Sequence, residues 1–124
     1  MFKKLFLIFL IAFALNLVWE FSHSVLYESY RSGEITSPIL LYVSVMDGLY
    51  ILALTGAAIL FKINKSAFVI IGGLIFAIAL ELWAQDTGRW VYTAAMPIIP
   101  VLNIGLTPVI QLALTGFVTQ KLVL

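Results

Sequence analysis

The chain has 124 residues, of which 63% are hydrophobic and only 10% are charged, and its formal net charge is +1. A soluble domain carries about 25% charged residues, so this composition predicts membrane-spanning helices and excludes an ordinary water-soluble fold. The absence of cysteine excludes disulfides, thiolate metal sites, cysteine nucleophiles and palmitoylation. The small net charge and the lack of a basic cluster argue against nucleic-acid binding.

Four apolar stretches predict an all-α membrane four-helix bundle that forms a single domain over residues 1–124. The expected spans are residues 5–30, 39–61, 67–85 and a last span that begins at 100 or 107 and ends at 122. The start of the first span is similar to a signal peptide, with Lys3 and Lys4 before an apolar run and Ala12 and Ala14 at a cleavage-like position. Because the apolar run continues through Trp19, we expect this segment to be a span.

Turn and capping residues mark the ends of the first three spans. Residues 31–34 are expected to end the first span with a turn. Ser37 is expected to cap the second span with Pro38 in its first turn, and Ser66 to cap the third. Gly88 is expected to stop the third span.

The approach to the last span is irregular, because Pro97, Pro100 and Gly105 all interrupt helix. We expect an extended, half-helical or re-entrant piece over residues 97–106, followed by a helix that Thr107 caps. A continuous but kinked helix from Pro100 is the alternative. If the helix begins at Thr107, the partial positive charge of its N-terminus points towards the acidic residues described below.

The placement of lysine and arginine predicts the side of the membrane on which each loop lies. With the N-terminus inside, all five lysines are cytoplasmic, whereas Arg31 and Arg89 lie outside. We therefore expect an integral membrane protein with both termini inside.

Small residues at a spacing of four allow close helix packing. Ala53 and Ala57 have this spacing in the second span, and Gly73 and Ala77 have it in the third. Because a short connection makes these two spans neighbours, we expect them to pack closely on each other.

Polar residues within the spans fall at a similar depth. At about 1.5 Å of rise per residue, Asp47 lies about 12 Å and Glu81 about 9 Å below the outer surface of a core about 30 Å thick. Glu20 and Gln111 also fall in the outer part, and the inner half has almost no polar residues. We expect these side chains to face one another inside the bundle and to form an acidic, polar pocket.

Helical spacing places further polar residues beside this pocket. Asn16, Glu20, His23 and Tyr27 follow a 4, 3, 4 spacing and so share one helix face. The candidate ligand-binding residues are those that surround the carboxyl groups: Asn16, Tyr27, Arg89, Trp90, Tyr92 and Gln111.

The acidic residues are the candidate acid–base groups, because charged groups within a span indicate a functional site by default. Glu81 and Glu20 would form the acid–base pair, with Asp47 and His23 assisting. We do not expect all three carboxyl groups to be ionised at neutral pH, since they repel one another. Arg89 is the cation expected to reach back towards them.

Other interpretations of these residues stay open. The same polar groups could form a purely structural network that fixes helix packing. Tryptophans and tyrosines near the span ends are typical interfacial anchors, although Trp90 and Tyr92 could also form a lid. No cofactor is expected, because the sequence has no phosphate-binding glycine loop.

A metal site is a further alternative. The Glu20-x-x-His23 spacing resembles half of a di-iron carboxylate motif, in which a glutamate and a histidine share one helix face. Such a motif needs two histidines, and this chain has one. The candidate metal ligands would be Glu20, His23, Asp47 and Glu81.

Several of these positions resemble those of a family of small bacterial four-span integral membrane proteins without an established activity. The shared patterns are N-x-x-W-E over residues 16–20, followed by Tyr27, and an acidic residue in the third span at Glu81. The closing signature resembles W-x-Y-x-x-x-M-P-x-x-P over residues 90–100 and G-L-x-P-x-x-Q over residues 105–111. The resemblance covers nearly the whole chain and implies a location in the bacterial inner membrane.

Two positions depart from the pattern of that family. Asp47 and Gly48 stand in the reverse order of its acidic "GD" position, and His23 stands where it has glutamine. A looser architectural likeness connects the chain to the emopamil-binding and sigma-2 receptor group, which are small helical membrane proteins with acidic residues in a sterol-sized pocket.

These observations lead to a functional hypothesis with two rivals. The acidic pocket is expected to bind, or to act by acid–base chemistry on, an amphipathic lipid or isoprenoid-like molecule that enters from the outer leaflet. The first rival is a structural or assembly subunit without enzymatic activity, and the second is a proton- or ion-coupled element that works as a homo-oligomer.

Overall fold

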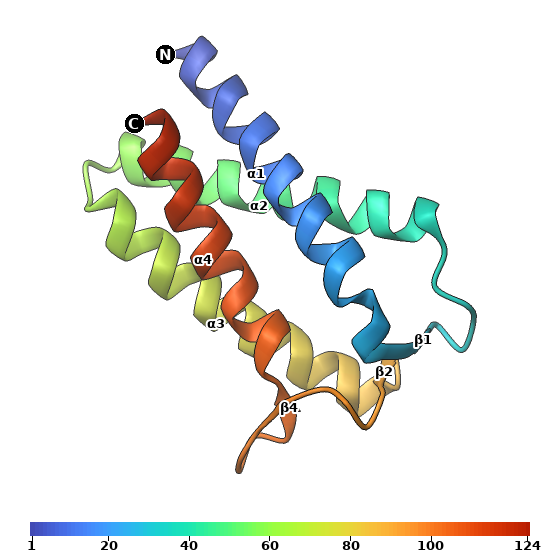
Figure 1. Ribbon diagram of the computed structural model, residues 1–124. Coiled ribbons are helices and arrows are strands. Elements are labelled where there is room, and N and C mark those ends of the chain that lie inside the picture. Colours follow the sequence, from blue (N-terminus) through green and yellow to red (C-terminus); the bar gives the residue numbers. More distant parts are fainter.

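The computed structural model describes residues 1–124 and has four long helices joined by turns and short strands (Figure 1). In chain order the elements are α1 (Phe2–His23), the 3-10 turn η1 (Ser24–Leu26), β1 (Tyr27–Tyr30), α2 (Ser37–Leu60), α3 (Lys65–Thr87), β2 (Trp90–Tyr92), β3 (Ile98–Ile99), β4 (Ile104–Gly105) and α4 (Leu106–Val123). All four α-helices are long and apolar enough to cross a membrane. The prediction of an all-α membrane four-helix bundle is confirmed.

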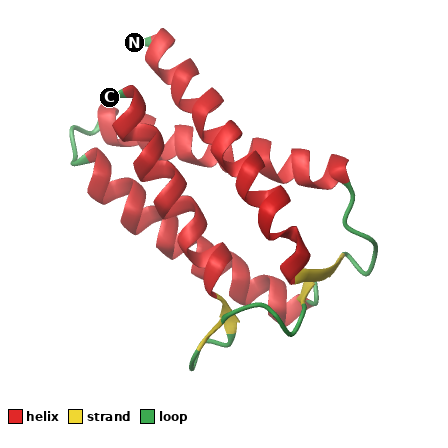
Figure 2. Cartoon of the chain, in the orientation of Figure 1, coloured by secondary structure: helices red, strands yellow, loops and turns green.

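The two ends of the bundle differ in structure. Figure 1 shows both chain termini at one end, together with the turn between α2 and α3, and we call this the terminal end. The strands lie at the opposite end, which we call the strand end (Figure 2). There β1 pairs with β2 and β3 pairs with β4, both antiparallel.

The helices pack most closely as two pairs, α1 with α2 and α3 with α4. Gly48 of α2 lies against α1, where an added Cβ would be 3.3 Å from Phe13 Cα. Gly73 of α3 lies against α4, where an added Cβ would be 2.9 Å from the backbone nitrogen of Ala113. Gly73 faces α4 and Ala53 is exposed, so these small residues do not pack α2 on α3 as expected. The two helices touch instead at Gly72, whose carbonyl oxygen accepts from the Tyr50 hydroxyl at 3.2 Å.

The α2 and α3 helices are close at their connecting turn and diverge towards the strand end (Figure 1). The cause is that each helix packs on a different partner, α2 on α1 and α3 on α4. The candidate site lies where the two helices have separated.

The first helix is shorter than the sequence predicts. The α1 helix ends at His23 instead of continuing to Tyr30, and the residues from Tyr27 onwards form β1. The reason is a partner distant in sequence, because aromatic residues of β1 and β2 face each other across the strand pair. Local spacing gives no sign of this pairing.

Helix starts also differ from the expected caps. Asn64, and not Ser66, caps α3, because its side-chain oxygen accepts a hydrogen bond of 2.9 Å from the backbone nitrogen of Ala67. Ser37 is the first residue of α2 and makes no capping hydrogen bond. Thr107 lies inside α4, whose cap position is Gly105.

The segment before α4 is extended, as one of the expectations states. Residues 98–99 and 104–105 form the β3–β4 hairpin, so the alternative of a kinked helix from Pro100 is wrong. The hairpin turn holds Val101 at φ 73° and Asn103 at φ 57°, a left-handed conformation that a helix cannot contain.

The end of α3 at Gly88 is confirmed and supplies a first testable prediction. Gly88 has a φ of 69°, and a Cβ added there would meet no atom within 4 Å. Gly88→Ala should therefore lower the free energy of unfolding by about 1 kcal/mol through backbone conformation alone. Denaturant titration of the detergent-solubilised protein measures this, and Gly56→Ala, at an equally open position within α2, should not destabilise.

Candidate functional site

The β1–β2 pair turns four aromatic side chains towards one face. Tyr27 pairs with Tyr92, and Tyr30 pairs with Trp90. The two residues of β1 are three positions apart in the sequence, whereas the two residues of β2 are only two positions apart. An irregularity between Tyr27 and Ser29 accounts for the extra residue and acts as a β-bulge, which returns Tyr30 to the face of Tyr27. The ring centroids of Tyr30 and Trp90 are 6.1 Å apart and nearly parallel, and those of Tyr27 and Tyr92 are 5.6 Å apart.

This aromatic face binds the carboxyl group of Glu81. Trp90 Nε1 donates to Glu81 Oε1 at 3.2 Å, and the Tyr92 hydroxyl donates to the same oxygen. The backbone nitrogen of Gly105 donates in turn to the Tyr92 hydroxyl at 3.0 Å, which connects β2 to the start of α4. Trp90 and Tyr92 therefore fit the lid interpretation, because their polar atoms point inward to Glu81.

Two tyrosines of this face, Tyr27 and Tyr92, remain protonated donors. Burial raises the pKa of Tyr92 above its usual range, and the nearby Glu81 carboxyl raises it further. Burial also raises the pKa of Tyr27 far above its usual range, with additional contributions from Glu81, Glu20 and Asp47. A phenol that stays protonated can only add hydrogen bonding to the site, without adding charge.

A second group of polar residues is organised around Gln111 of α4. Its Nε2 lies 2.9 Å from Asn16 Oδ1, 2.9 Å from Glu20 Oε1 and 3.1 Å from Asp47 Oδ2. An amide nitrogen has two hydrogens, so three acceptors share two donor positions. Thr115, one turn further along α4, also contacts Asn16, whose Nδ2 lies 3.1 Å from Thr115 Oγ1. The expected meeting of α1, α2 and α4 at this depth is confirmed.

Glu20 connects this group to the strand end. Its second oxygen, Oε2, lies 3.1 Å from His23 Nε2, and this is the single contact within 4 Å between a carboxyl group and a basic side chain. His23 Nδ1 lies 3.4 Å from the hydroxyl of Thr107, and its ring packs edge-on against Tyr27. The predicted helix face of Asn16, Glu20 and His23 is buried as a unit, whereas Tyr27 reaches the same place from β1.

The carboxyl groups of Glu20 and Asp47 meet at Gln111, whose Nε2 lies 2.9 Å from Glu20 Oε1 and 3.1 Å from Asp47 Oδ2. Carboxyl groups are common proton donors and acceptors in general acid–base chemistry. This pair is the part of the site best suited to accept or release a proton.

Arg89 does not balance these carboxyl groups. Its guanidinium lies over the ring of Trp83, 5.4 Å from the ring centroid, and makes no ion pair. The expectation that Arg89 reaches back to the acidic cluster is wrong, because its guanidinium stacks on Trp83 of its own helix end instead. His23 is consequently the only basic side chain beside the three carboxyl groups.

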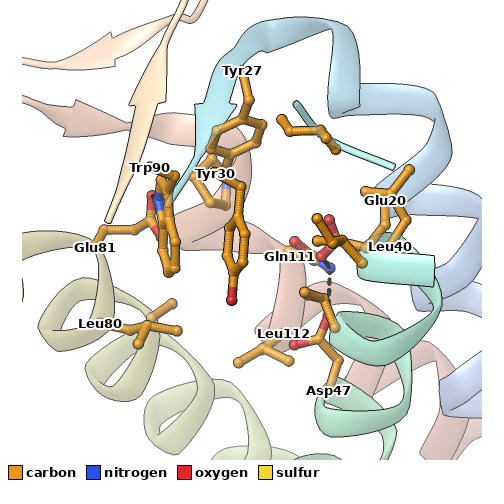
Figure 3. Close-up of a pocket in the computed structure, with 15 residues that line it drawn as sticks. Glu20, Tyr27, Tyr30, Leu40, Asp47, Leu80, Glu81, Trp90, Gln111 and Leu112 are labelled. Atoms are coloured by element: carbon orange, nitrogen blue, oxygen red, sulfur yellow. Dashed lines mark hydrogen bonds between the residues drawn. The ribbon is translucent and has the colours of Figure 1, made fainter. Parts of the chain in front are cut away.

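A cavity of about 100 Å³ lies between the two polar groups, and residues of all four helices and of β1 and β2 line it (Figure 3). Glu81 and Trp90 stand on one side, with Asp47 and Gln111 on the other. Tyr30 lies between them with its hydroxyl in the cavity. Leucine and isoleucine side chains of α2 and α3 supply much of the remaining wall.

Sequence reasoning missed Tyr30 as a pocket residue and treated it as an anchor. No local signal could have found it, because its position depends on the β-bulge and on pairing with Trp90. Tyr27, Trp90, Tyr92, Asn16 and Gln111 all lie at the site as predicted, and Arg89 alone of the predicted ligand-binding residues does not.

The terminal end is more polar inside than the sequence suggests. Gln120 Nε2 donates to the Thr55 hydroxyl at 2.9 Å, and both side chains are buried. The expectation of an almost apolar half is therefore wrong, because this hydrogen bond pairs polar groups of α2 and α4 inside the bundle.

No group of three or more histidine, aspartate or glutamate side chains is placed to hold a metal ion, so Glu20, His23, Asp47 and Glu81 do not form a metal centre within the chain.

No family model matches the chain, and no curated protein or solved structure matches it either. What the site can do must therefore follow from its geometry and from the resemblance in sequence pattern.

Proposed function

We propose that this integral membrane protein binds an amphipathic, lipid-like or isoprenoid-like molecule in the cavity between α2 and α3. The observation that carries the proposal is the unequal hydrogen bonding of the two carboxyl oxygens of Glu81. Both of its hydrogen bonds end on Oε1, while Oε2 has no protein partner although the residue is buried beside the cavity. The fully buried side-chain polar atoms without a partner are Trp19 Nε1 and Gln120 Oε1, so Glu81 Oε2 is open to the cavity, where a polar group of a ligand can bind it.

The size and position of the cavity support an elongated ligand. A space of about 100 Å³ is smaller than the roughly 300–1,000 Å³ of pockets that enclose a whole small molecule. It can hold a polar group, while the apolar remainder lies between the diverging α2 and α3 helices. A lipid reaches such a cavity sideways from the bilayer, without crossing water.

The acid–base part of the proposal rests on the Glu20–Asp47 pair. A proton on one of these carboxyl groups can be passed to a ligand, and His23 Nε2 lies 3.1 Å from Glu20 Oε2, within reach for proton transfer. Glu81 faces the same cavity from the opposite side. With both termini inside the cell, as the lysines indicate, the strand end and the cavity belong to the outer leaflet of a bacterial inner membrane.

A second candidate function is structural, and the Gln111 group favours it. Gln111, Asn16 and Thr115 are buried and satisfy one another within the protein, as expected of a network that fixes the register of α1 against α4. In this alternative the chain is an assembly subunit, or a proton-coupled element of a homo-oligomer, and the cavity holds only water.

Glu81→Gln distinguishes the two functions. The glutamine oxygen can still accept from Trp90 and Tyr92, so the fold should be retained, whereas the acidic Oε2 is lost. Native mass spectrometry of the protein extracted in mild detergent should show a bound amphipathic molecule on the wild type and at least about tenfold less on the variant.

The matched control is Glu28→Gln, an exposed glutamate of β1 that does not line the cavity. It should retain the ligand as the wild type does. Equal retention by Glu81→Gln would contradict the binding proposal, and unfolding of Glu81→Gln without any ligand on the wild type would favour the structural function.

A further inference from the structure

A second pocket, of about 300 Å³, opens beside the acidic cavity at the strand end. Its lining consists of Tyr30, Arg31, Pro38, Ile39, Tyr42 and Arg89. Tyr30 and Ile39 line both pockets and form the wall between them. The two arginines of this end of the bundle therefore lie around one hollow, next to the proposed ligand site.

The backbone holds the two arginines together. Arg31 follows β1 and Arg89 precedes β2, and the backbone nitrogen of Arg31 donates to the carbonyl oxygen of Arg89 at 2.6 Å. Arg31 has a φ of 50°, in a turn closed by reciprocal backbone hydrogen bonds between Tyr30 and Gly33. A left-handed conformation is uncommon for a residue other than glycine or asparagine, and such strain is concentrated at functional sites.

Neither guanidinium has a polar partner in the protein. Arg31 lies over the Tyr30 ring and Arg89 over the Trp83 ring, at 5.8 and 5.4 Å from the ring centroids. These stacked positions cover one face of each guanidinium and leave its edge of N–H donors free. The chain makes no arginine ion pair, although exposed carboxylates occur on the same end at Glu28, Glu34 and Asp86.

We infer that Arg31 and Arg89 form a subsite for the phosphate of a phosphate-bearing lipid. Two unpaired guanidinium edges beside one pocket match the geometry by which arginine binds phosphate through paired hydrogen bonds. Ile39 and Tyr42 belong to the first turns of α2, where a spanning helix leaves the headgroup region, so the phosphate of a bilayer lipid lies at this level.

This inference rests on the proposed function and assigns an orientation to its ligand. Three carboxyl groups repel an anion, so the phosphate cannot enter the acidic cavity and stays at the arginines. The next part of the molecule passes Tyr30 and Ile39 into the cavity. The group that meets Glu81 is then neutral, such as a hydroxyl, an ester or a double bond.

The experiment compares three probes on the purified protein in neutral detergent: dioleoyl phosphatidate, dioleoylglycerol with the same chains, and inorganic phosphate. The wild type should bind phosphatidate at least about tenfold more tightly than dioleoylglycerol, as measured by native mass spectrometry. Inorganic phosphate at the same concentration should not displace phosphatidate.

The test variant is Arg31→Asn with Arg89→Gln, since asparagine tolerates the left-handed backbone at position 31. It should bind phosphatidate no better than dioleoylglycerol. The control Lys62→Gln with Lys65→Gln removes two positive charges at the terminal end and should behave as the wild type. Circular dichroism checks that both double variants are folded.

Each outcome separates the two proposals. Unchanged phosphatidate binding by the arginine variant overturns the phosphate subsite, and so does equal wild-type binding of the two lipids. Displacement by inorganic phosphate assigns the pocket to the free anion and overturns the lipid inference. A wild type that binds neither lipid refutes the proposed function itself.

Discussion

Gly73→Val is expected to lower the free energy of unfolding by about 3 kcal/mol, at the upper end of what overpacking usually costs. A Cβ at this position would come within 2.9 Å of the backbone nitrogen of Ala113 and 3.2 Å of its Cα. Backbone atoms cannot rotate away as a side chain can, so α4 would have to move off α3. SDS titration of the protein in detergent micelles measures the loss.

Gly56→Val is the matched control for this substitution. Gly56 lies within α2, and a Cβ there would meet no atom within 4 Å. Valine has a slightly better helix propensity than glycine, so this variant should be neutral or slightly stabilised. A loss of similar size in both variants would show that valine itself, and not the α3–α4 contact, causes the destabilisation.

The predicted effect at Gly73 also concerns the site. The α3–α4 contact sets the position of Glu81 relative to Gln111, because Glu81 lies about two turns from Gly73 on α3 and Gln111 about half a turn from Ala113 on α4. The cavity lies further along α3 than this contact, where Ala77, Leu80 and Glu81 line it.

The span positions and much of the site could be predicted from the sequence, because both depend on fixed helix geometry. Apolar runs locate the spans, and a constant rise per residue places Glu20, Asp47 and Gln111 at one depth. The hydrogen bonds of Gln111 to Glu20 and Asp47 confirm that these residues meet. The 4 and 3 spacing of Asn16, Glu20 and His23 was sufficient to place them on one buried face.

The features that could not be predicted all depend on contacts between distant segments. The strand pairing that ends α1 early joins residues about sixty positions apart, and its bulge alone brings Tyr30 into the cavity. Gly73 faces α4 instead of its neighbour in sequence, α2. Arg89 lies over Trp83, although charge alone favours the carboxyl groups.

The two polar glutamines of α4 provide a comparison of structural and functional roles. Gln111 and Gln120 are 5% and 3% exposed, so burial does not distinguish them. Gln111 Nε2 approaches acceptors of both α1 and α2, whereas Gln120 makes one hydrogen bond to Thr55 and its Oε1 has no partner. Removal of each side chain should therefore have a very different cost.

Gln111→Leu is expected to lower the free energy of unfolding by about 3 kcal/mol or more. The substitution leaves Glu20 Oε1 and Asp47 Oδ2 without their shared donor, whereas Asn16 Oδ1 still accepts from Thr115 Oγ1 at 3.3 Å. An acceptor that loses its partner away from water costs about 1–3 kcal/mol. Gln120→Leu removes one hydrogen bond together with an oxygen that had no partner, so its net change should stay below about 1 kcal/mol. Both changes are measured by the same SDS titration.

The comparison of these two losses in unfolding free energy shows how much the stability of the bundle depends on the hydrogen bonds of Gln111 to the carboxyl groups. If Gln111→Leu is as mild as Gln120→Leu, water or a bound ligand already satisfies the carboxyl groups, and the amide does not hold them. If Gln111→Leu is severe but regains stability when Glu20→Leu is added, the cost arises from the unpaired carboxyl group at Glu20. Because Glu20→Leu also removes the contact of Glu20 Oε2 with His23 Nε2, the single variant Glu20→Leu completes the cycle and isolates the Gln111–Glu20 interaction from the other contacts of α1.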